Sequence, residues 1–170
     1  MVSNLTYENK KYKESQSIHY KCSKMLQEYS KELSFLINED TNAYNNIISS
    51  RRLPKKTQSQ IAFRNNEINK STIYAIEVPL KVLETTLKVH EITYEVLKYA
   101  NLSCISDIGV ANQSIFSSSN SAAYNILINI EDINTNLKNK YHKKVDYYTK
   151  QINNNYLKIN MIVDKKLGIK

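Results

Sequence analysis

The apolar residues of this sequence recur every third or fourth position over long stretches. A period near 3.6 residues is that of an amphipathic α-helix, so the pattern predicts helices and not strands. The clearest stripe consists of Ile18, Cys22, Met25, Tyr29, Leu33, Leu36, Ala43 and Ile47. In outline, the pattern predicts a short remnant up to about Tyr7 and four long helices, at about Lys10–Ser50, Gln58–Tyr99, Asn101–Ile133 and Asn134–Lys166.

Prolines and capping residues mark the ends of these stretches. Pro54 disfavours helix at Leu53, and Thr57 is suited to cap the next helix. Pro79 lies inside that helix, so we expect a kink or break near Glu77. A helix of 30 residues is about 45 Å long. The expected fold is therefore all-α: an elongated up-down bundle of four long helices, forming one domain over residues 1–170.

Composition narrows the class of protein. The 170 residues include two glycines, Gly109 and Gly168, and two prolines. Phosphate-binding loops and dinucleotide folds need several glycines at fixed turns, so both are excluded. No apolar run is long enough to span a membrane, and the N-terminus has no apolar signal core. We expect a cytoplasmic protein.

Charge and metal-binding residues give weaker signals. The net charge of +8 makes anionic partners plausible, but the basic residues form neither a dense run nor an evident stripe, so nucleic acid ranks last among them. Cys22 and Cys104 lie far apart without CxxC partners, and no histidine has metal-ligand spacing. We therefore expect no metal and two buried thiols.

Some polar residues occupy positions where the stripes call for apolar ones. Asp40 lies four residues after Leu36 and four before Tyr44, in the middle of an apolar arc. A carboxylate there is costly unless it is paired. Asp40 is therefore a satisfied core acid, the end of the stripe, or a functional acid with a raised pKa.

Four further polar residues lie on or beside the apolar arcs. Asn129 falls within the arc of its helix and Asn125 at its edge, four residues apart and on one face. Asn65 lies on the stripe of its own helix, with Arg64 at the edge. Buried asparagine commonly fixes helix register. Alternatively, a cavity lined by Asp, Arg and Asn suits a polar heterocycle.

Several motifs together resemble one family. Residues 101–111 (NLSCISDIGVA) and 123–130 (AYNILINI) are similar to the signature of the cyclodeaminase domain of formiminotransferase-cyclodeaminase. Further pieces follow in the family's order: MVSNLTY at 1–7, DTNAY at 40–44, LPK at 53–55 with the later Arg64, and AIEVPL at 75–80. The resemblance covers nearly the whole chain.

The resemblance implies an all-α homodimer, or a higher oligomer, that binds a tetrahydrofolate derivative. Its reaction would convert 5-formiminotetrahydrofolate to 5,10-methenyltetrahydrofolate and ammonia, a step of histidine degradation. The alternative is a methenyltetrahydrofolate cyclohydrolase; the NLSC form of the signature favours the cyclodeaminase. The family's catalytic carboxylate maps to Asp40. Substrate-binding or supporting roles fall to Arg64, Asn101, Asp107, Asn125 and Asn129.

The resemblance also bears on partners. A positive rim around the site would suit a polyglutamylated folate, and a formiminotransferase would be a separate chain. The family's Pro-Gly-Gly-Gly-Ser segment and most of its first helix have no counterpart here, and Ala100 and Glu8 stand where the family has glycine. A non-catalytic member that serves as a binding or structural module is therefore a second hypothesis. A basic helical adaptor for nucleic acid is a third.

Overall fold

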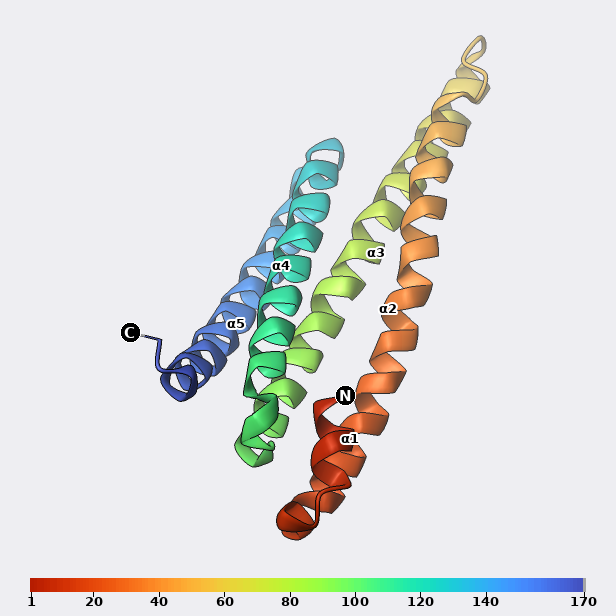
Figure 1. The fold of residues 1–170 in the computed structure, drawn as a ribbon. Coiled ribbons are helices and arrows are strands. Elements are labelled where there is room, and N and C mark those ends of the chain that lie inside the picture. Colours follow the sequence, from red (N-terminus) through yellow and green to blue (C-terminus); the bar gives the residue numbers. More distant parts are fainter. Residues whose placement is uncertain (170) are drawn as a thin grey trace.

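The computed structural model describes residues 1–169, which are almost entirely helical (Figure 1). No strand occurs among them. The all-α class and the predicted set of four long helices with a short N-terminal helix are confirmed. In chain order the elements are α1 (Val2–Tyr7), the 3₁₀ helix η1 (Lys10–Ser15), α2 (Gln16–Arg51), α3 (Gln58–Tyr99), η2 (Leu102–Cys104), α4 (Ile105–Asn129), η3 (Ile130–Asp132) and α5 (Thr135–Leu167).

The helix boundaries follow the predicted capping residues, with two differences. The Thr57 Oγ1 atom accepts from the backbone N–H of Gln60 at 3.3 Å, and the Gln60 side chain accepts from the backbone N–H of Thr57, so α3 begins with a capping box. The predicted helix from Lys10 begins instead as a 3₁₀ helix in which Tyr12 leaves helical geometry. Likewise, α4 ends before the expected Ile133 and continues as η3. Such 3₁₀ turns are common at helix ends.

Of the kink or break expected near Glu77, the break is wrong. Helix α3 runs unbroken from Gln58 to Tyr99 with Pro79 inside it. Proline removes one backbone hydrogen bond, the bond to the carbonyl four residues earlier. That carbonyl belongs to Ala75 and receives a hydrogen bond from α4 instead.

The four long helices alternate in direction, with α3 at the centre. Helix α3 packs against α2, α4 and α5, whereas α2 packs mainly against α3 and α1. Tyr141 of α5 donates to Glu77 of α3 at 2.5 Å, and Tyr148 donates to Glu84 at 3.1 Å. The second pair thus lies seven residues further along both helices. The two helices therefore run parallel. The α2–α3 hairpin extends beyond the turn between α4 and α5, which gives the bundle its elongated shape (Figure 1).

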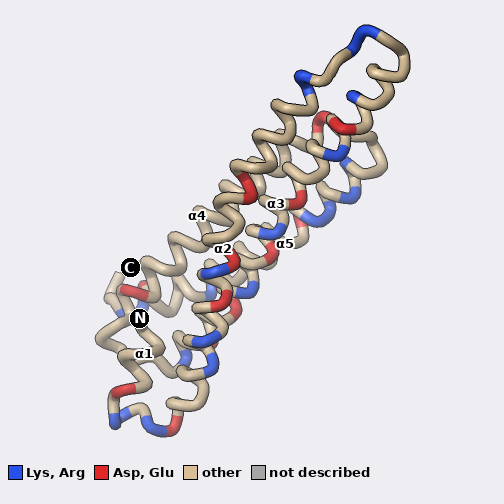
Figure 2. Tube along the Cα trace, turned by 90° about the vertical axis from the view of Figure 1, so that its right-hand side faces the viewer, with Lys and Arg blue, Asp and Glu red and all other residues tan. Residues whose placement is uncertain are grey.

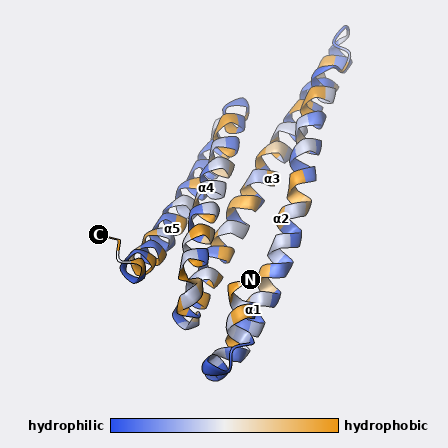
Figure 3. Ribbon diagram, in the orientation of Figure 1, coloured by the Kyte–Doolittle hydropathy of each residue, from blue (hydrophilic) through white to orange (hydrophobic). Residues whose placement is uncertain are grey.

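Three apolar clusters hold the bundle together. Figure 3 shows apolar residues recurring along the helices in orange. One joins α3, α4 and α5 and includes Ile76, Leu83, Ile126 and Ile152. A second lies at the α1 end, where all four long helices contribute and the free thiols of Cys22 and Cys104 are buried as predicted. The third joins only α2 and α3, through Leu36, Ala43, Ala75 and Val78. Away from the α1 end, therefore, α2 and α4 are not bridged by a shared core.

A fully buried histidine links α3, α4 and α5. The Nε2 atom of His90 lies 2.9 Å from the Asn112 Oδ1 atom, and the Asn112 amide donates to the Tyr156 carbonyl at 3.2 Å. Because Oδ1 only accepts, the Nε2 atom of His90 is the donor in this hydrogen bond. Burial lowers the pKa of His90, and its hydrogen bond to Asn112 offsets part of that effect.

This burial predicts a loss of stability in mild acid. In the unfolded chain His90 binds a proton near pH 6.5, whereas in the folded chain its lowered pKa opposes protonation. The contribution of His90 to the free energy of unfolding is therefore fully present above pH 6.5 and declines as the pH falls below it. We expect the free energy of unfolding to fall by up to about 1.4 kcal/mol per pH unit from this group. Urea unfolding of the wild type and of His90→Gln between pH 7.5 and 5.5 measures it. Equal pH slopes would exclude His90 as the source.

Candidate functional site

An open groove of about 790 Å³ runs between α2 and α4, with α3 as its floor. Its floor includes Pro79, Val82 and Val89 of α3. Asp40 lines the α2 wall, and Asn125 lines the α4 wall. The groove lies where α2 and α4 share no core. It forms there because α2 packs on α3 and not on α4.

Hydroxyl groups line both walls of the groove and share one hydrogen-bonding pattern. On α4, Ser118 donates to the Ser114 carbonyl at 2.8 Å and Ser121 to the Ser117 carbonyl at 3.0 Å. On α2, Ser34 donates to the Ser30 carbonyl at 2.8 Å. Since each hydroxyl has one proton and two lone pairs, these oxygens remain available as acceptors. The walls therefore suit a ligand with N–H donors.

Polar contacts between α2 and α3 anchor the wall that carries Asp40. Tyr74 of α3 donates to Glu39, the residue before Asp40, and this hydrogen bond is the main cause of the raised pKa of Tyr74. One or two turns earlier, Lys81 and Glu32 form an ion pair at 3.2 Å. The backbone at Asp40 is thus fixed relative to the groove floor.

Of the three interpretations of Asp40, that of a satisfied core acid is wrong. Asp40 is exposed at the groove, and Tyr44, one turn further, is 65% exposed. In the C-terminal half of α2 the buried positions follow a narrow line one heptad apart, at Leu36, Ala43 and Ser50. A helix with one principal neighbour buries a narrower stripe than a helix inside a bundle, and Asp40 falls beside it.

The structure brings three of the predicted site residues together. Asp40 and Asn125 line the same groove. The Asn129 amide donates to the carbonyls of Asn125 and Ala75 and so lies next to it.

Two other predicted residues make structural contacts at opposite ends of the bundle. Arg64 donates through Nε and Nη2 to the Arg51 carbonyl at 3.3 and 3.1 Å, at the C-terminus of α2. Asn101 accepts from the Ser103 backbone N–H at 3.1 Å and caps η2. Neither lines the groove. Their expected roles in substrate binding stay predictions.

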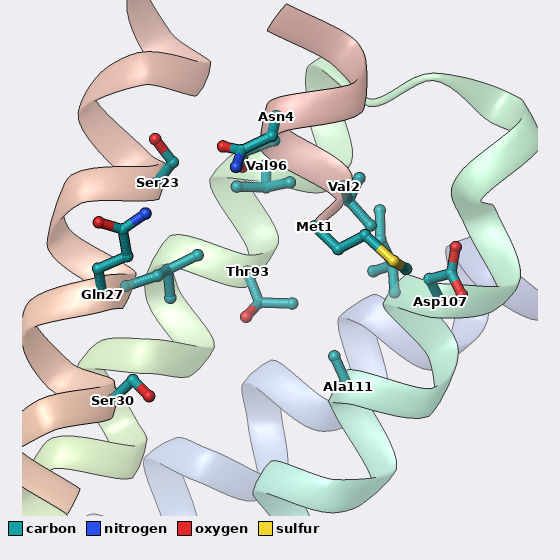
Figure 4. Close-up of a pocket in the computed structure, with 13 residues that line it drawn as sticks. Met1, Val2, Asn4, Ser23, Gln27, Ser30, Thr93, Val96, Asp107 and Ala111 are labelled. Atoms are coloured by element: carbon teal, nitrogen blue, oxygen red, sulfur yellow. The ribbon is translucent and has the colours of Figure 1, made fainter.

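Asp107 lies in a second hollow of about 340 Å³ beneath α1 (Figure 4). It lies on the first turn of α4, close to Met1, while Thr93 projects from α3 in the middle of the view (Figure 4). Leu26 and Ser30 line both this hollow and the groove. The two spaces are therefore neighbours along α2, with Asp107 in one and Asp40 in the other.

The positive charge of the chain is concentrated away from the groove. Helix α5 has eight lysines and two aspartates, which accounts for +6 of the net +8 (Figure 2). Among the residues described, the groove lining includes neither lysine nor arginine. The expected positive rim is thus not part of the groove itself, and α5 carries the basic surface that the spacing did not make evident. None of the described helices is long and apolar enough to cross a membrane.

Several lining residues were not singled out by the sequence pattern as part of a site. Ser117, Ser118 and Ser121 were not among the candidate site residues. They lie on α4, and their side chains are exposed and line the groove. Pro79 was expected only to disturb its helix, but it and Thr86 also line the groove. The i, i+3/i+4 spacing of these serines, which places them on one face of a helix, was the sequence feature that could have indicated a polar wall.

The fold and the site thus define a class of protein: an elongated helical bundle whose groove presents a carboxylate and an amide. The sequence matches the formiminotransferase-cyclodeaminase family model over residues 1–147. The chain belongs to this family.

Individual relatives agree with this assignment. Formimidoyltransferase-cyclodeaminase of Mus musculus is 27% identical over 146 residues, which cover 85% of this chain and 27% of that protein. Methenyltetrahydrofolate cyclohydrolase of Methylorubrum extorquens is 30% identical over 133 residues, covering 78% of this chain and 64% of that protein. The chain therefore spans only part of the curated relatives that it matches.

A solved structure has the same fold. The crystal structure of formiminotetrahydrofolate cyclodeaminase from Thermotoga maritima superposes with a TM-score of 0.84 and covers 98% of this chain and 80% of that chain, at 18% sequence identity. This likeness establishes the arrangement of the helices.

Proposed function

We propose that this protein binds a reduced folate in the groove between α2 and α4 and acts on its one-carbon unit. The main support for this proposal is the position of Asp40. It is the first residue of the DTNAY segment at 40–44, which resembles the family's D-x-x-A-F/Y motif, and it lines the same groove as Asn125. Family membership and the names of the relatives supply the substrate class.

The groove suits the parts of a folate. Its apolar lining residues, such as Leu33, Val82 and Ile115, offer a surface for the flat aminobenzoyl ring. The serine oxygens on both walls accept hydrogen bonds, which matches the amino and ring N–H groups of a reduced pterin. Asp40 then faces the one-carbon unit between N5 and N10.

In the cyclodeaminase reaction, N10 of 5-formiminotetrahydrofolate attacks the carbon of the protonated formimino group (–CH=NH₂⁺). This forms the second carbon–nitrogen bond of the new ring and leaves an amino group on a tetrahedral carbon. The Asp40 carboxylate takes the proton that N10 loses and returns it to the amino group on the tetrahedral carbon. The bond from that carbon to the amino group breaks, and ammonia and 5,10-methenyltetrahydrofolate leave. General acid–base catalysis of this kind contributes about 10²–10⁴-fold.

Two alternatives use the same groove. In a methenyltetrahydrofolate cyclohydrolase, Asp40 would take a proton from a water molecule that attacks the methenyl carbon and would pass it to N5 as the bond from that carbon to N5 breaks. The new hydroxyl group would lose its proton to solvent and become the carbonyl of 10-formyltetrahydrofolate. The Methylorubrum relative carries this name. In a binding or structural module, the groove would hold folate without turnover. A homodimer, a separate formiminotransferase partner, a polyglutamylated substrate, a role in histidine degradation and a cytoplasmic location remain parts of the proposal.

The test is to supply the purified chain with each substrate in turn. Release of ammonia and methenyl product from 5-formiminotetrahydrofolate supports the cyclodeaminase, and conversion of 5,10-methenyltetrahydrofolate alone supports the cyclohydrolase. Calorimetric binding of 5-formyltetrahydrofolate without either turnover supports the binding module. Absence of binding and of both activities would contradict the proposal.

A further inference from the structure

The side-chain amide of Asn129, the last residue of α4, joins two helices. Its Nδ2 atom donates to the Ala75 carbonyl of α3 at 3.3 Å and to the Asn125 carbonyl of its own helix at 2.8 Å. Both partners are carbonyl oxygens, which only accept, so the nitrogen must face them. These bonds use both amide protons.

The Ala75 carbonyl needs this donor because of Pro79. In an α-helix the carbonyl of residue 75 accepts from the N–H of residue 79, and proline has none. Ala75 is only 7% exposed, so little water can reach its carbonyl. An unpaired buried acceptor is costly. Asn129 thus supplies from α4 the hydrogen bond that α3 cannot make, which explains why α3 continues through Pro79.

The two carbonyls belong to the turns that shape the groove. Pro79 lies on the groove floor and Asn125 on the α4 wall, while Asn129 itself is not among the lining residues. We propose that Asn129 is a positioning residue, which keeps the Pro79 turn of α3 and the Asn125 turn of α4 in register across the groove without contacting the folate. The positioning role rests on the proposed function. The pairing itself, in which Asn129 donates to the Ala75 carbonyl that Pro79 leaves without a donor, does not.

A double-mutant cycle tests the pairing by stability alone. Asn129→Ala is expected to lower the Tm of the wild type by about 3–8 °C, since it leaves the Ala75 carbonyl unpaired. In the Pro79→Ala background the loss should be clearly smaller, because the new alanine N–H can donate to that carbonyl. Asn120→Ala, at another half-buried asparagine of α4, is the control and should lower the Tm equally in both backgrounds. Equal losses for Asn129→Ala in the two backgrounds would overturn the pairing.

The same four proteins separate a positioning role from a substrate contact. With the substrate that the wild type turns over, or with 5-formyltetrahydrofolate where it only binds, Asn129→Ala should weaken kcat/KM or affinity about tenfold. If Asn129 acts through Pro79, the loss should shrink in the Pro79→Ala background. If Asn129 touches the folate, an N–H at residue 79 cannot restore the contact, and an undiminished loss would refute the positioning role. A wild type that neither binds nor turns over folate refutes the proposed function and with it the positioning role, while the Tm cycle still decides the pairing.

Discussion

Replacing Asp40 with asparagine is expected to slow the release of ammonia from 5-formiminotetrahydrofolate by about 10²–10⁴-fold. Asparagine keeps the size and shape of the side chain but can neither take the N10 proton nor return it to the leaving amino group. Because Asp40 is exposed and no hydrogen bond of its side chain was found among the described residues, the substitution should leave the Tm unchanged. The measurement is kcat for ammonia release by the two proteins, with Tm recorded alongside.

The control is Asp146→Asn, at an exposed aspartate of α5 outside the groove. It removes one negative charge as Asp40→Asn does, and its rate should match that of the wild type. Equal rates for Asp40→Asn and the wild type would remove Asp40 from the mechanism. Equal losses in the two variants would point to net charge and not to a proton relay.

Much of this fold follows from local sequence signals. The apolar period predicts the four long helices, and Thr57 predicts the start of α3 because its hydroxyl satisfies a backbone N–H that the first turn leaves unpaired. The helix does not break near Glu77, and the reason is non-local. The missing donor comes from Asn129, 50 positions further along the chain, and no pattern within α3 reveals it.

The candidate site was harder to predict, because it depends on which helices pack together. Periodicity put Asp40 in the middle of an apolar arc and so made a core acid one of three interpretations, since it assumes that such an arc is covered along its whole width. Helix α2 packs mainly on α3, so the arc is only partly covered and Asp40 lies at an open groove. The family motif singled out the same residue as the catalytic carboxylate, which stays a proposal, and the structure places it at the groove.

Filling the groove with Ser118→Trp is expected to lower kcat/KM for the folate substrate about 10- to 100-fold. Ser118 is exposed and lines the α4 wall, so an indole ring there occupies ligand space without disturbing the core. Val110→Trp adds an indole to the same helix, at a residue that is 67% exposed and outside the groove lining, and should leave kcat/KM unchanged. Both variants should keep the Tm of the wild type. Since Ser118→Trp obstructs the site without removing a catalytic group, a loss expressed mainly in KM distinguishes it from Asp40→Asn, whose loss lies in kcat. If the tryptophan at residue 118 leaves both constants unchanged, the folate binds elsewhere, and the hollow that contains Asp107 becomes the next site to block.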